Sequence, residues 1–90
     1  MKNTMDICDD VIDPTTIQTV NHPSLKLHNV PNPKNNEPLS AAILHELKTR
    51  LLGQSIVWDV VMKDNQRTFV QVRTLDGLNI NSYLRDNFST

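Results

Sequence analysis

The prolines of this chain lie in its first part, and the glycines and aromatic residues lie in its second part. All five prolines lie at or before Pro38, whereas both glycines and every aromatic residue lie after Leu52. Residues 1–40 carry five acidic side chains against three lysines and show no sustained hydrophobic period. Such a segment cannot bury enough apolar surface to offset the entropy of the chain. The sequence therefore predicts a flexible, acidic, proline-containing tail over 1–40 and a small α+β interaction module over 41–90.

The composition limits the chain of 90 residues to at most one domain. No run approaches the roughly 20 apolar residues of a membrane helix, and the acidic start lacks the apolar stretch of a signal peptide. The formal net charge of -1 provides no overall field to attract a polyanion. We expect no membrane association and a cytoplasmic or nuclear location, which suits a lone Cys8 that can close no internal disulfide.

The second part begins with a helical pattern. Its apolar residues Ile43, Leu44, Leu47 and Leu51 recur at the spacing of one helix face. Ser40 is a suitable N-cap, Pro38 just upstream suits a helix start, and Gly53 suits a left-handed terminator. We expect an amphipathic helix from about Ser40 to Gly53.

A β-hairpin and a short helix are predicted to follow. Alternation over 56–62 and 68–75 indicates two antiparallel strands joined by a turn at 63–66, and Asp76-Gly77 ends the second strand. Ile80, Tyr83, Leu84 and Phe88 fit one face of a closing helix, with Asn79 or Asn81 as its cap. A third strand is the alternative, because part of this segment also satisfies a period of two.

A module of about 50 residues is close to the size at which a single core becomes marginal. A lone hairpin would also leave two strand edges open. We therefore expect a partner subunit or a homodimer to complete the structure. The alternative is that the tail folds back as an extra strand, since 15–20 and 25–30 have some β character.

Two groups of residues in the second part of the chain are candidates for binding. The predicted protein-binding set is Leu44, Leu47, Leu51, Trp58, Phe69 and Tyr83, although Trp58 and Phe69 are favoured as core side chains. The set for RNA is Lys63, Arg67 and Arg73, because alternation places Arg67, Phe69, Gln71 and Arg73 on one strand face. Asp59, Asp64 and Asp86 would weaken the positive field there, so a solvated face is the favoured interpretation.

The tail contains one short peptide signal. Ile17, Gln18 and Thr19 resemble the extended peptide that adds a strand to the dynein light chain dimer. In this mode the backbone supplies the affinity and a side chain fixes the register.

Nothing in the sequence indicates catalysis. His22, His28 and His45 lack the spacing of metal ligands. The acidic neighbours of Cys8 raise the pKa of a thiol and so disfavour a nucleophile. The chain has no phosphate-binding glycine loop and no nucleophile elbow. We expect a protein that is not an enzyme and needs no cofactor or metal.

The stretch 41–88 resembles the second half of a staphylococcal-nuclease-like oligonucleotide-binding fold, of the type found in extended Tudor domains. The likeness rests on the helix AAILHELKTRLLG, the strands SIVWDVVMKD and RTFVQVRTL, and the segment DGLNINSYL. In that segment Asp76, Gly77, Ile80, Asn81 and Leu84 match the family motif, whereas Phe88 stands where a glycine is usual. The first half of the chain offers no calcium-binding acids in a strand-like setting, so the resemblance implies no nuclease activity.

A second resemblance is to atypical Sm-like proteins of the gemin type. Leu52, Gly53, Val57, Asp76 and either Asn79 or Asn81 match that pattern, although the chain is about two strands short of an Sm barrel. Both resemblances imply a small β-barrel-like module of the oligonucleotide-binding or Sm-like type. They imply a non-catalytic adaptor or subunit in ribonucleoprotein assembly or RNA silencing, with direct RNA binding as the alternative.

Overall fold

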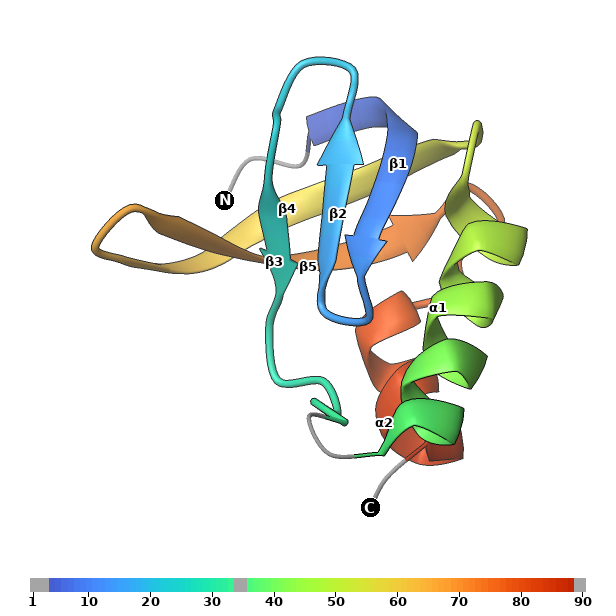
Figure 1. Cartoon of the computed structure of the whole chain (residues 1–90). Coiled ribbons are helices and arrows are strands. Elements are labelled where there is room, and N and C mark those ends of the chain that lie inside the picture. Colours follow the sequence, from blue (N-terminus) through green and yellow to red (C-terminus); the bar gives the residue numbers. More distant parts are fainter. Residues whose placement is uncertain (1–3, 34–35, 89–90) are drawn as a thin grey trace.

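The computed structural model describes residues 4–33 and 36–88, which form five strands and two helices (Figure 1). The elements are β1 (Thr4–Asp13), β2 (Thr16–Thr19), β3 (Leu25–Leu27), α1 (Glu37–Leu51), β4 (Ser55–Asp64), β5 (Arg67–Thr74) and α2 (Ile80–Phe88). The predicted α+β class is confirmed, as are the helix, the hairpin and the closing helix of the second part. No helix in the described residues is long and apolar enough to cross a membrane.

The strands are hydrogen-bonded in the order β1-β2-β3-β5-β4, and β1 pairs with β4 to close the sheet into a ring. β3 and β5 run parallel, and the other neighbours run antiparallel. The predicted open edges of the hairpin are therefore wrong, because β1 covers β4 and β3 covers β5. The hairpin nevertheless extends beyond the ring at its turn, as the left side of Figure 1 shows.

The interpretation of 1–40 as a flexible tail is also wrong for most of that segment. Residues 4–27 supply three of the five strands. The alternative that the tail folds back as an extra strand is therefore closer to the structure, which has three such strands. Residues 1–3 and 34–35 lie outside the described part of the chain. The hydrophobic period is hard to recognise here because register shifts interrupt the pairing of β1 with β2 between Cys8 and Asp10 and between Val11 and Asp13.

The core fills the ring and the space beneath the helices. Its apolar members are Cys8, Val11, Ile17, Leu25, Leu27, Ile43, Leu47, Leu51, Ile56, Trp58, Val70, Val72, Ile80 and Leu84. Five of these fourteen come from β1, β2 and β3. The interior of the second part is therefore completed by the same chain, and the argument that it needs a partner to fold does not hold.

The ends of α1 differ from the prediction at one side only. Asn36, rather than Ser40, is the N-cap, and its Oδ1 accepts a hydrogen bond from the Leu39 N–H at 3.1 Å. Pro38 consequently lies in the first turn, where its missing N–H is not needed. Gly53 follows the helix with φ of 77°, which confirms its predicted role as the left-handed terminator.

The start of α2 fixes the helix to the sheet through a buried amide. Asn79, one of the two predicted caps, accepts a hydrogen bond from the Ser82 N–H. Asn81 is only 2% exposed. Its Nδ2 donates to the carbonyls of His28 (2.8 Å) and Val70 (3.0 Å), and its Oδ1 accepts from the Val72 N–H (2.9 Å). Asn81 therefore connects α2, β5 and the segment after β3.

Candidate protein-binding surface

An apolar patch lies on the outer face of β1, β4 and β5. Asp6 is buried, so its neighbours Met5 and Ile7 point outward, and they are 67% and 46% exposed. Met5 is paired with Val57, and Val57 with Arg73, while Ile7 is paired with Ser55. Residues paired across antiparallel strands share a face. Met5, Ile7 and Val57 thus form the centre of a surface that the ring does not cover.

Two further exposed side chains extend this patch. The Val20 N–H donates to the Ile7 carbonyl at 3.0 Å, and the Val20 side chain is 62% exposed. Leu75, just beyond β5, is also 62% exposed. Leu75 lines a hollow of about 300 Å³ together with Val57 and Arg73. We call Met5, Ile7, Val20, Val57 and Leu75 the apolar strip.

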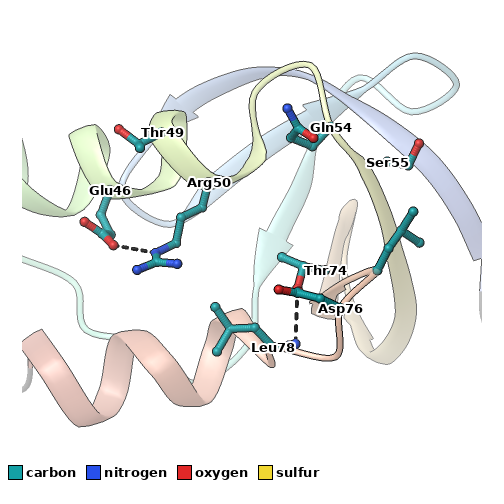
Figure 2. Close-up of a pocket in the computed structure, with 9 residues that line it drawn as sticks. Glu46, Thr49, Arg50, Gln54, Ser55, Thr74, Asp76 and Leu78 are labelled. Atoms are coloured by element: carbon teal, nitrogen blue, oxygen red, sulfur yellow. Dashed lines mark hydrogen bonds and ion pairs between the residues drawn. The ribbon is translucent and has the colours of Figure 1, made fainter.

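A larger groove begins where the apolar strip ends. It has a volume of about 720 Å³ and lies between the C-terminal end of α1 and the turn from β5 to α2 (Figure 2). Leu75 lines this groove as well as the smaller hollow. The other lining residues are Glu46, Thr49, Arg50, Gln54, Ser55, Thr74, Asp76 and Leu78. We call this cavity the polar groove.

One wall of the polar groove is a cluster of charged and aromatic side chains between the helices. Figure 2 shows Arg50 reaching from α1 into the groove beside Glu46. The Arg50 Nε and the Tyr83 hydroxyl both donate to Glu46 Oε1, and Arg50 Nη2 donates to the Tyr83 hydroxyl oxygen at 3.1 Å. The guanidinium also lies 4.5 Å from the centre of the Tyr83 ring.

These bonds set the charges of the groove. The hydrogen bond from Arg50, followed by that from Tyr83, lowers the pKa of Glu46. On the opposite wall, the hydrogen bond from the Thr74 hydroxyl lowers the pKa of Asp76. Both carboxylates are therefore ionised at neutral pH. The bond to Glu46 also raises the pKa of Arg50, which keeps its guanidinium charged.

The opposite wall is a tight turn organised by Thr74. Its hydroxyl donates to Asp76 and accepts from the Leu78 N–H at 3.1 Å. Its backbone N–H donates to the Leu78 carbonyl at 2.9 Å, and its carbonyl accepts from the Gly77 N–H at 3.0 Å. Gly77 has φ of 97°, a conformation that side chains disfavour. The turn thus holds Leu75 and Asp76 in fixed positions.

The predicted protein-binding set lies mostly elsewhere. Leu47, Leu51 and Trp58 are at most 5% exposed and belong to the core, so the prediction that they bind a partner is wrong for the folded chain. The regular spacing of these residues results from their packing in the core and not from contact with another protein. Leu44 and Tyr83 are partly buried against the core.

Some of the residues predicted to bind RNA share one face of β5, and the others lie at the end of the hairpin. Val70 and Val72 are buried, so Phe69, Gln71 and Arg73 point outward from β5. Phe69 is half-buried on that face rather than in the core. It pairs with Lys26 on β3 and Met62 on β4, and its ring centre lies 6.4 Å from that of His28. Lys63 and Arg67 are exposed at the end of the hairpin.

The dynein-type peptide is not available as an extended strand. Ile17 and Thr19 are buried inside the ring, and the Gln18 amide donates to Asp9 at 3.0 Å. β2 is paired with β1 on one side and with β3 on the other. Strand addition requires a free edge, so the prediction of dynein light chain binding through Ile17, Gln18 and Thr19 is wrong for the folded chain.

A polar cluster at one end of the ring has a structural explanation. His22 Nδ1 lies 3.5 Å from Asp6 Oδ2, and the His22 ring meets the Trp58 ring edge-on at 4.7 Å. Burial raises the pKa of Asp6, but the hydrogen bond from the Ile7 N–H, the nearby Thr19 and His22 side chains and the hydrogen bond from Asn21 outweigh this effect and lower the pKa overall. The cluster thus stabilises a buried, ionised carboxylate.

Cys8 and the three histidines are the residues considered above for catalysis and metal binding. Burial raises the pKa of the Cys8 thiol to about 11, and Asp10 and Asp9 add to this rise, so the thiol is protonated at neutral pH. Within residues 4–33 and 36–88, no three His, Cys, Asp or Glu side chains could together hold a metal ion.

The sequence reasoning missed the apolar strip. In β1 the apolar Met5 and Ile7 flank the charged Asp6, a pattern that predicts the opposite orientation, with Asp6 outside. Inside the ring, Asn21 donates a hydrogen bond to the Asp6 carboxylate and His22 Nδ1 lies 3.5 Å from it, and these contacts favour the reversed orientation. Comparison with known proteins found no family model and no curated protein that matches the chain.

Proposed function

We propose that this chain is a non-catalytic protein-interaction module, an adaptor or subunit that binds another protein through the apolar strip. The observation that carries the proposal is the exposure of Met5, Ile7, Val20 and Leu75 beside one another on a ring that is already closed. Contiguous apolar patches on a complete fold mark interaction sites. The partner is another subunit or a second copy of the chain.

The proposed setting is ribonucleoprotein assembly or RNA silencing, in the cytoplasm or nucleus. It rests on the resemblance of 41–88 to staphylococcal-nuclease-like oligonucleotide-binding modules. A closed five-stranded ring with β1 returning to β4 supports that likeness, because this fold is a five-stranded barrel. The motif residues Ile80, Asn81 and Leu84 are also buried where they join α2 to the sheet. The step from fold to cellular setting is an analogy.

The test compares substitutions inside and outside the strip. Ile7→Lys and Leu75→Lys place a charge in the apolar strip, whereas Ile12→Lys and Val61→Lys alter side chains that are 49% and 42% exposed elsewhere. Circular dichroism first establishes that each variant is folded. We expect proteins captured by the tagged wild-type chain to be lost with the first pair and retained with the second. Equal capture by all four variants would remove the apolar strip from the proposal.

Direct RNA binding is the second candidate function, favoured by the Phe69 face. Phe69 lies in a row with Lys26 and beside His28, and Lys63 and Arg67 lie at the hairpin end. An aromatic ring among cations can stack a base and neutralise phosphate. A titration of single-stranded oligouridine at several salt concentrations tests this candidate. It predicts a steep salt dependence and a loss of affinity in Arg67→Gln and Arg73→Gln, whereas protein binding through the apolar strip persists at high salt.

A further inference from the structure

We propose that the protein segment bound by the apolar strip carries a lysine or arginine, which enters the polar groove beside Glu46 and Asp76. This inference rests on the proposed function and adds the chemistry of the partner. Two observations support it: the apolar strip is continuous with the polar groove, and the polar groove is negatively charged.

The strip and the groove form one surface. Leu75 lines both the polar groove and the smaller hollow that contains Val57. Ser55, which also lines the groove, is paired with Ile7 of the strip. A partner segment with apolar side chains on Ile7 and Leu75 therefore has its next residues at the mouth of the groove.

The charges of the groove favour a cation. Glu46 and Asp76 are carboxylates on opposite walls, and Arg50 is the guanidinium that faces them. Arg50 is already engaged by Glu46 and by the hydroxyl and ring of Tyr83. The last turn of α1 adds the negative end of the helix dipole, which Lys48 and Arg50 partly offset. The groove thus has an excess of negative charge that a basic side chain can neutralise.

A cation lies beside the apolar strip as well. Arg73 is paired with Val57 and lines the smaller hollow together with Val57 and Leu75. The surface therefore has two carboxylates in the groove and a positive charge next to Val57. A bound segment gains most when its basic residue lies on the groove side. Thr49 and Gln54, both exposed in the groove, offer this residue further polar contacts.

The experiment uses a phage-displayed library of random peptides selected on the full chain. We expect the selected peptides to share apolar residues next to a lysine or arginine, and to lose binding to Leu75→Lys. A selected peptide is then synthesised with its basic residue or with glutamine. The peptide with glutamine should bind the wild-type chain about two- to fivefold more weakly, the range for an exposed ion pair.

The chain variants separate charge from shape. Asp76→Asn removes the charge but retains an oxygen that can accept from Thr74, and it should abolish the difference between the two peptides. Asp86→Asn, an exposed acid on α2, is the matched control and should leave the difference intact. If selected peptides need Leu75 but show no basic residue, or an acidic one, this inference is overturned and the proposed function stands. If no selected peptide depends on Leu75, the proposed function fails as well.

Discussion

Residues 4–27 and residues 37–88 contribute to one ring in different ways. The second region supplies both helices and the long hairpin, and α1 alone places Ile43, Leu47 and Leu51 in the core. The first region supplies three strands, and most of the buried polar residues of the described chain lie in it: Asp6, Thr16 and Thr19, against Asn81 in the second. The first region therefore combines apolar packing with buried polar side chains, whereas the second buries apolar side chains and one amide, that of Asn81.

Removing the first region should have the largest effect. A chain of residues 37–90 leaves β4 and β5 without β1 and β3, and it exposes the inner faces of Ile56 and Val70. Unpaired edges and a core open on one side do not sustain cooperative folding at this size. We expect thermal unfolding followed by circular dichroism to lose its sigmoidal transition. A fragment that melts like the full chain would show that the second region is independent.

The next largest effect is expected where one side chain joins the two regions. Asn81→Ala removes three hydrogen bonds, one of them to the His28 carbonyl after β3, and leaves buried backbone groups without that partner. It should lower the free energy of unfolding by about 2–4 kcal/mol. Asn87→Ala is the control, because Asn87 is exposed and its amide donates to the Tyr83 carbonyl of the same helix. Urea titration measures both, and equal effects would show that the Asn81 amide does not join the regions.

Acid should weaken the first region through its carboxylates. The pKa of Asp13, like that of Asp6, is lowered: burial raises it, but hydrogen bonds from the Thr15 N–H and hydroxyl and from Thr16 outweigh this effect. The pKa values of these two carboxyl groups are lower in the folded chain than in the unfolded chain. Their contribution to the free energy of unfolding is therefore complete above the unfolded pKa of about 3.9, and it is lost as the pH falls through the folded pKa. Urea titrations from pH 7 to pH 2 should show this loss, and Asp6→Asn should make it smaller. An unchanged pH profile in Asp6→Asn would contradict the assignment.

The smallest effect is expected in an experiment on the unaltered chain. Because Cys8 is buried and burial raises its pKa to about 11, iodoacetamide should modify it only when β1 opens. We compare this rate at pH 8 with hydrogen exchange of the Val72 amide in β5. If the first region opens by itself, Cys8 reacts faster than global unfolding allows. Equal opening free energies would mean that the two regions separate only when the whole chain unfolds.

The same contrast explains what could be predicted from the sequence. The elements of the second region were found because Ile43, Leu47 and Leu51 keep a helical period and Ile56 and Trp58 keep a strand period. The strands of the first region escaped because register shifts interrupt the alternation after Cys8 and after Val11. Charged Asp6 also lies inside, where it depends in part on partners distant in the sequence, such as Asn21.

The apolar strip was not predicted from the sequence for a related reason. Reasoning from the sequence selected the strongest apolar periods as binding residues, but a closed ring buries such residues first, as it does Leu47 and Leu51. The apolar strip combines Met5, Val57 and Leu75, which lie far apart in the sequence and become neighbours through strand pairing. The shared face of Phe69 and Arg73 was predicted correctly because it depends only on alternation within one strand.

The pairing of β1 with β4 also bears on how the chain is made. Thr4 lies opposite Trp58, so β1 can close the ring only after the ribosome has also released β4. Pairing between such distant segments slows folding. The nascent chain consequently carries β1 without β4 until that later strand emerges, a period in which chaperones have access to the unpaired strand edge.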